Sequence, residues 1–152
     1  ALGAGLLLFE IQESSDTTFR VYDWNRTGLD GTRRPLHVAE SMASIDFDDH
    51  APGLVDTAWV SDGTTEVRSL VKDLLFGAEA RRGRGGEVWE QGLDRCRIVA
   101  VARGALCLGD ERDPVRLAAG DFCLLPAGMG SVRGRLEGDT EWVTAAPGPG
   151  RN

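Results

Sequence analysis

Histidine and cysteine are scarce in this sequence. The two histidines, His37 and His50, have no partner at H-x-H or H-x3-H spacing, which argues against a metal site built from local histidines. The three cysteines are odd in number and form no C-x-x-C pair. They therefore make no complete disulfide framework, and they favour free, buried thiols in a reducing compartment, for which we expect a cytoplasmic location.

Excess positive charge and long apolar runs are also missing. The formal net charge is −7, so the chain is a poor electrostatic partner for nucleic acid or an anionic membrane. The apolar run at the N-terminus is too short to span a bilayer. The glycine-rich pieces lack the residues of a phosphate loop or a dinucleotide fingerprint, and no serine stands in a nucleophile elbow.

Glycine, by contrast, is abundant, with 20 among the 152 residues. Frequent glycine favours short strands joined by turns over long helices. From about residue 54, short apolar segments alternate with glycine-rich or acidic turns, which predicts an all-β barrel or sandwich. The expected strands are 65–70, 74–80, 86–91, 95–102, 105–108, 115–117, 122–125, 131–136 and 141–145.

The first half of the chain has a different pattern. Segments 4–13 and 17–24 are apolar enough to predict two further strands, and the apolar spacing within 37–45 predicts a short amphipathic helix. Alternate residues of a strand share a face, so Asp16, Thr18 and Arg20 are expected together. Carboxylates and a guanidinium aimed together suit a polyol or phosphate ligand, while a solvated strand edge is the structural alternative.

The best-defined motif of the second half is Gly120–Gly128, which reads G-D-F-C-L-L-P-A-G. It resembles the second conserved motif of the cupin superfamily, G-x5-P-x-G-x2-H, but Ser131 stands at the histidine position. The stretch 86–104, where an H-x-H pair would lie, contains no histidine. The resemblance implies a jelly-roll barrel without metal ligands, in which this motif has a structural role.

Residues 10–24 resemble a second family. The run E-I-Q-E-S-S-D-T-T-F-R-V-Y-D-W, together with the R-P-L-H sequence at 34–37, is similar to type I mannose-6-phosphate isomerases of the short bacterial form. The resemblance implies a zinc-dependent enzyme that interconverts mannose 6-phosphate and fructose 6-phosphate through an enediol. It assigns catalytic roles to Arg20 and Glu10 and a substrate-binding role to Asp16, and it leaves open which group is the base.

The same resemblance implies that the family's four zinc ligands lie upstream of residue 1, so we expect this chain to bind no metal and to be inactive alone. The expected domains are 1–24, the last strands of a catalytic cupin; 25–64, a loop and linker helix; 65–146, a metal-less second cupin; and 147–152, a tail. Unpaired strands recruit edges, which predicts self-association through residues 4–24. A non-catalytic cupin module for sugar binding or dimerisation is the alternative.

Overall fold

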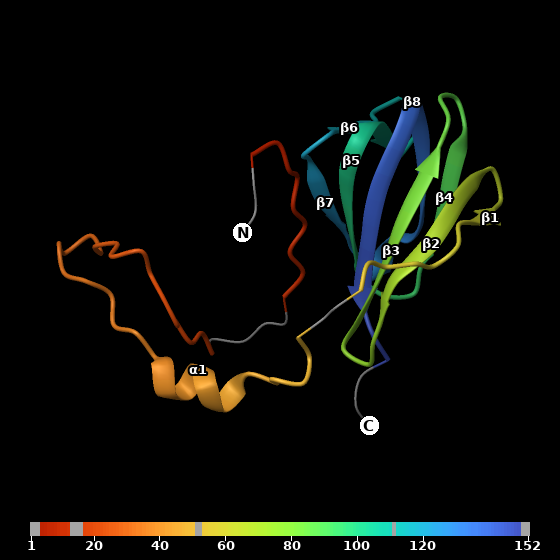
Figure 1. The fold of residues 1–152 in the computed structure, drawn as a ribbon. Helices are drawn as coiled ribbons and strands as arrows, with labels where there is room; N and C mark the ends of the chain where they lie inside the picture. The colour runs from red at the N-terminus through yellow and green to blue at the C-terminus, as the bar shows by residue number, and fades with distance from the viewer. Residues whose placement is uncertain (1–3, 13–16, 51–52, 111, 150–152) are drawn as a thin grey trace. The chain divides into compact units, whose positions relative to one another are not determined.

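A computed structural model describes residues 4–12, 17–50, 53–110 and 112–149. The chain divides into two compact units. Unit 1 comprises the described residues of Ala1–Ile11 and Val55–Asn152, and unit 2 comprises those of Gln12–Leu54. All strands lie in unit 1 and the α-helix lies in unit 2, as Figure 1 shows.

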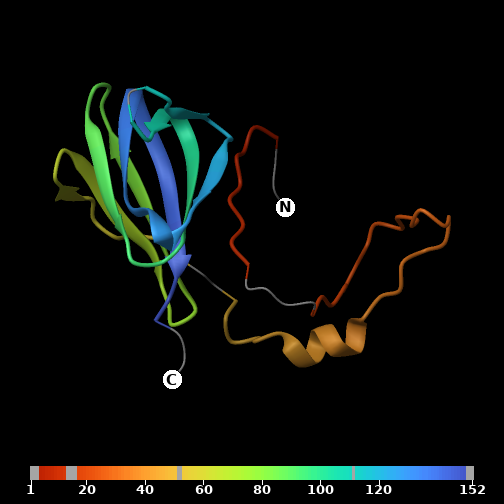
Figure 2. The same cartoon turned by 180° about the vertical axis from the view of Figure 1, so that it is seen from behind.

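Unit 1 is an antiparallel barrel in whose wall the two longest strands, β5 and β8, run side by side (Figures 1 and 2). The sheet order is β1-β2-β3-β8-β5-β6, with β4 also paired to β8 and β7 also paired to β5. The strands are β1 (Val60–Asp62), β2 (Thr65–Lys72), β3 (Phe76–Gly83), β4 (Val88–Leu93), β5 (Arg97–Leu108), β6 (Val115–Ala118), β7 (Phe122–Leu125) and β8 (Gly130–Pro147), with a 3-10 turn at Ala127–Met129.

Both long strands change neighbours at a bend. On one side, β8 pairs with β4 through 130–135 and with β3 through 140–147. Strand β5 likewise pairs with β7 through 97–100 and with β6 through 105–108. The ladder between β5 and β8 shifts register around Arg103, as expected where strands turn a corner between two sheets.

Gly104 makes this corner possible. Its φ is +73°, and an added Cβ would lie 2.5 Å from the carbonyl oxygen of Asp139 and 2.6 Å from Oγ1 of Thr140. The Thr140 hydroxyl is fully buried and donates a hydrogen bond of 3.0 Å to the carbonyl oxygen of Ala105. Only glycine combines this backbone conformation with such close approach of the neighbouring strand.

Apolar side chains fill most of the barrel. The indole rings of Trp89 and Trp142 meet edge to face with their centroids 5.6 Å apart, which is a favourable geometry for aromatic pairs. Around them pack buried aliphatic residues from β4, β5, β6, β7 and β8: Leu93, Val99, Val101, Leu106, Leu108, Leu117, Leu125, Val132 and Leu136. This architecture confirms the predicted all-β class, and the only α-helix of the described residues is short.

The predicted strands of the second half correspond closely to the observed ones. Segment 122–125 matches β7 residue for residue, and segment 65–70 falls inside β2. The predicted strands 95–102 and 105–108 form the single strand β5, and 131–136 and 141–145 form the single strand β8. In both cases the chain bends, near Gly104 and Gly138, without leaving the sheet. The sequence prediction missed the three-residue strand β1.

Unit 2 is a loop structure around one helix. Helix α1 spans Val38–Ser44, within the predicted 37–45, and buries Ser41. Ahead of it, Thr27 and Arg33 form an isolated antiparallel bridge across a loop in which Gly28 accepts a backbone hydrogen bond from Gly31. None of the helices among the described residues has the length and hydropathy required to cross a bilayer.

The two strands predicted at 4–13 and 17–24 are wrong in the described parts of these segments, 4–12 and 17–24. In the second segment, the Arg20 carbonyl accepts from the His37 amide and the Asp23 carbonyl from the Arg26 amide, so no strand ladder forms. Trp24 and Asn25 then turn to positive φ, which ends the extended run. Apolar alternation alone does not make a strand where no hydrogen-bonding partner lies alongside.

Candidate functional site

Arg20 is held by contacts to the loop that precedes α1. Its Nη1 donates to the Pro35 carbonyl oxygen at 2.9 Å, and its Nε lies 3.7 Å from Oδ1 of Asp23. The backbones of Arg20 and His37 are joined, because the Arg20 amide donates to Nδ1 of His37 at 3.2 Å and the His37 amide donates to the Arg20 carbonyl oxygen at 2.8 Å. The Arg20 side chain is 23% exposed, so the guanidinium is oriented and still reachable.

Asp23 is the anchor of this network. Arg34 donates two hydrogen bonds to its carboxylate, one from Nε to Oδ2 at 2.8 Å and one from Nη2 to Oδ1. The hydrogen bonds from Arg34, with the charges of Arg34, Arg20 and Arg26, hold the pKa of the Asp23 carboxyl below its usual range against a smaller opposing effect of desolvation. Asp23 therefore stays ionised at neutral pH and holds the side chains of Arg20 and Arg34 in place.

The other two predicted site residues are placed differently. Glu10 is an exposed residue of unit 1, whereas Arg20 belongs to unit 2. Asp16 lies outside the described residues. The network of Asp23, Arg34 and His37 around Arg20 was missed from sequence. The spacing of these residues gave no signal, because the loop brings together positions that are far apart along the chain.

The residues present do not fit a zinc ion. No group of three or more His, Cys, Asp or Glu side chains converges within the described residues. In the barrel, the position where the cupin motif has its histidine carries an exposed Ser131, and its neighbour Val132 points into the apolar core. The described part of the chain therefore shows no ligand set for zinc.

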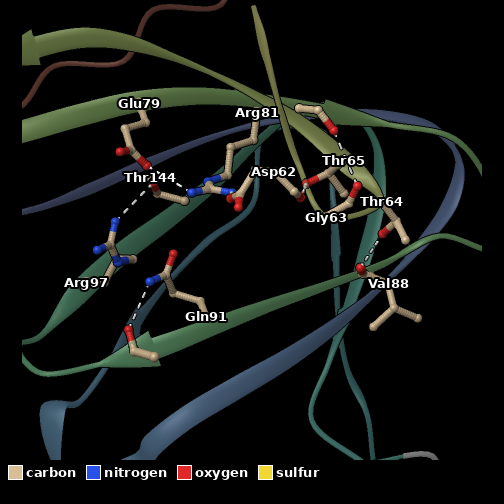
Figure 3. Close-up of polar contacts among 12 residues, drawn as sticks. Asp62, Gly63, Thr64, Thr65, Glu79, Arg81, Val88, Gln91, Arg97 and Thr144 are labelled. Atoms are coloured by element: carbon tan, nitrogen blue, oxygen red, sulfur yellow. Dashed lines mark hydrogen bonds and ion pairs between the residues drawn. The ribbon is translucent and has the colours of Figure 1, made fainter.

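A second polar site lies inside the barrel of unit 1. Arg81, Gln91, Arg97 and Thr144 occupy core-facing positions, since each lies opposite a core residue or two residues from one on its own strand, and the partly exposed Glu79 lies opposite Thr144 on the same face. Figure 3 shows these five side chains turned toward one another from strands β3, β4, β5 and β8. Sequence reasoning missed this cluster, although charged residues at alternate positions of an otherwise apolar strand were a usable signal.

Arg81 is the most buried charged residue of the cluster, at 6% exposure. Its Nη1 meets Oδ2 of Asp62 at 2.5 Å, its Nη2 meets Oε2 of Glu79 at 3.1 Å, and its guanidinium lies 5.8 Å from the ring centroid of Trp89. Two carboxylates and an aromatic face thus compensate this buried charge. Arg97 has no such carboxylate partner among the described residues, and its Nη1 donates only to Oγ1 of Thr144, at 3.3 Å.

The barrel has the cupin fold, as its likeness to two solved structures shows. KdgF from Halomonas sp. aligns with 68% of this chain and 97% of its own, with a TM-score of 0.54 and 18% identity. An RmlC-like cupin from Shewanella frigidimarina aligns with 68% of this chain and 94% of its own, with a TM-score of 0.54 and 14% identity. At these identities the likeness concerns the fold alone. No family model matches the chain.

Within the cupins, the chain is a homologue of mannose-6-phosphate isomerases, as its sequence predicts. It is 49% identical to the probable mannose-6-phosphate isomerase GmuF of Bacillus subtilis over 97% of this chain and 45% of the relative. It is 30% identical to the mannose-6-phosphate isomerase of Streptococcus mutans over 95% of this chain and 44% of that relative. The crystal structure of the Bacillus subtilis mannose 6-phosphate isomerase aligns with 86% of this chain and 40% of its own, with a TM-score of 0.65 and 26% identity.

The chain spans a little under half the length of the curated relatives it matches. The catalytic activity and substrates of those longer proteins are therefore proposals for this chain.

Proposed function

We propose that this chain forms part of a mannose-6-phosphate isomerase, to which it contributes Arg20, Glu10 and Asp16 as site residues. The observation that carries the proposal is its 49% identity to GmuF, together with an Arg20 that the loop fixes in place. The sugar phosphate would be mannose 6-phosphate or fructose 6-phosphate, and the activity would be cytoplasmic.

The geometry of Arg20 suits a substrate contact. Its Nη1 is bound to Pro35 and its Nε faces Asp23, while its Nη2 has no hydrogen bond among the described residues. Interconversion of an aldose and a ketose moves a proton between C1 and C2 through an enediol, on whose oxygens negative charge develops. A fixed guanidinium stabilises that charge without reorganising during the reaction. Glu10 would orient hydroxyl groups or carry a proton.

The family resemblance implies zinc, but the described residues offer no ligand set for it. The proposal therefore assigns no metal step to these residues, and the 152-residue chain is expected to be inactive alone. In domain terms, 1–24 would complete a catalytic cupin, 25–64 would link it to the second cupin at 65–146, and 147–152 would be a tail. Self-association through residues 4–24 stays a prediction, although the strands on which it was based are absent from the described part of that segment.

A chimera tests the proposal. This chain would replace the matching residues of GmuF, and the folded chimera is expected to interconvert mannose 6-phosphate and fructose 6-phosphate. Arg20→Ala should lower kcat by about a hundredfold to a thousandfold, as expected when one charge-stabilising donor is removed. Arg33→Ala is the matched control, because the side chain of this nearby arginine is exposed and makes no hydrogen bond or ion pair with Arg20 or Asp23 among the described residues. This substitution should leave turnover unchanged.

Two results would count against the proposal. A chimera that folds and binds zinc but shows no isomerase activity would contradict the function itself. A fully active Arg20→Ala chimera with an unchanged melting temperature would keep the function and remove Arg20 from the site.

A further inference from the structure

The polar cluster of the barrel opens into a groove. Glu79 and Arg97 belong to this cluster and also line a surface groove of about 460 Å³ in unit 1. The volume is in the range of small-molecule sites, which run from about 300 to 1,000 Å³. The groove thus connects a core-facing polar cluster to solvent.

Arg97 is a partly buried cation of this region without a carboxylate partner among the described residues. Its single side-chain hydrogen bond among these residues is the 3.3 Å contact to Thr144. Its Nε is buried and makes no hydrogen bond. Since a partly buried cation without an anion is costly, an anionic ligand on Arg97 would gain strongly from the pairing.

The groove has further charged groups, and their signs balance. Three cations and three carboxylates line it: Lys72, Arg95, Arg97, Asp73, Glu79 and Asp94. Arg95 is already engaged with Asp94 at 3.2 Å and with the Pro147 carbonyl oxygen at 3.0 Å. Lys72, the only lysine of the sequence, has no ion pair among the described residues. Two cations are therefore left for a ligand, beside carboxylates that accept hydrogen bonds from hydroxyl groups.

The mixed charge of the groove favours a ligand with one negative charge and several hydroxyl groups. A carboxylate matches the planar fork of a guanidinium and brings a single negative charge. A doubly charged phosphate would meet three carboxylates in the groove of a chain whose net charge is −7. Hydroxyl groups on the same ligand would find acceptors in Glu79 and Asp73, of which Glu79 uses only Oε2 in its contact with Arg81.

We propose that this groove binds a small hydroxylated monocarboxylate, with the carboxylate on Arg97 and Lys72 and the hydroxyl groups on the neighbouring carboxylate side chains. The site belongs to the metal-less barrel and shares no residue with the proposed isomerase contribution of Arg20 and Glu10. Failure of the isomerase proposal would leave it intact.

The test is an NMR titration of the full chain with sodium gluconate. Because Lys72 is the only lysine, reductive methylation with a ¹³C label gives one side-chain lysine signal, which reports on the groove while keeping its charge. Gluconate should shift this signal saturably, with Kd of about 1 mM. Sorbitol, which has the same carbon chain without the carboxylate, and inorganic phosphate should each bind at least about tenfold more weakly.

Variants assign the contact. Arg97→Gln should weaken gluconate binding by about tenfold or more, measured from the ligand signals by saturation transfer. Arg103→Gln is the matched control, since Arg103 is an exposed arginine of the same strand paired with Glu141 at 3.0 Å, and it should bind as the parent does. If Arg97→Gln loses the folded spectrum, Lys72→Gln replaces it, with weakening expected for the same reason.

The proposal is overturned by a titration without saturable shifts, by sorbitol or phosphate binding as tightly as gluconate, or by a folded Arg97→Gln variant with parental affinity.

Discussion

Replacing Gly104 by alanine is expected to destabilise the barrel at the corner where β5 and β8 change neighbours. The new Cβ would lie 2.5 Å from the Asp139 carbonyl oxygen and 2.9 Å from Cα of Thr140, so backbone atoms must move. Left-handed φ costs a non-glycine residue about 1–2 kcal/mol, and forcing extra volume into a packed site costs about 1–3 kcal/mol. The sum is a loss of about 2–5 kcal/mol in the free energy of unfolding.

Gly120→Ala separates the two contributions. Gly120 also has positive φ, at +94°, but an added Cβ would meet no atom within 4 Å. Its expected cost is therefore only the conformational one, about 1–2 kcal/mol. Urea unfolding followed by tryptophan fluorescence measures both variants, since Trp89 and Trp142 report on the core. Equal destabilisation of the two variants would refute the close approach of β5 and β8 at this corner.

Two further predictions concern the other parts of the chain. The Asp23 pKa lies below its ordinary 3.8, so the ion pair with Arg34 stabilises unit 2 at and above that pH and is lost as the pH falls through the lowered value. The protection of unit 2 amides against hydrogen exchange, relative to their intrinsic exchange rates, should fall on acidification in the parent and change little with pH in Arg34→Gln; identical pH profiles would contradict the pairing. Trp142→Ala should cost about 3–5 kcal/mol because it empties a buried site, whereas Trp24→Ala, at a position 71% exposed, should change the melting temperature little; similar effects of the two changes would argue against this core.

The second half of the fold was largely readable from the sequence because its signals are local. Turn glycines and alternating apolar residues mark each strand, and Gly120–Gly128 indicated the cupin class. What alternation does not convey is whether a turn breaks a strand or bends it, and this depends on long-range pairing. The sequence pattern therefore predicts strand ends at Gly104 and Gly138, where the structure has bends within β5 and β8.

The candidate sites were less predictable. Arg20 was found through a family resemblance, but its supports, Pro35 and His37, come from a loop whose path no periodicity specifies. The apolar segments 4–13 and 17–24 predicted strands because their patterns are right, yet a strand also needs a neighbour to complete its hydrogen bonds. The barrel cluster of Glu79 and Arg97 requires the register of β3 and β5, which only the structure supplies.

We propose that this chain carries residues of an isomerase site but no zinc ligand set among its described residues, and an isomerase assay tests this proposal most directly. The folded 152-residue chain would be incubated with fructose 6-phosphate and added zinc, and mannose 6-phosphate would be measured over time. The account predicts no turnover above the protein-free control, because the described residues form no zinc site. A rate that rises in proportion to the chain concentration and disappears with a chelator would contradict it.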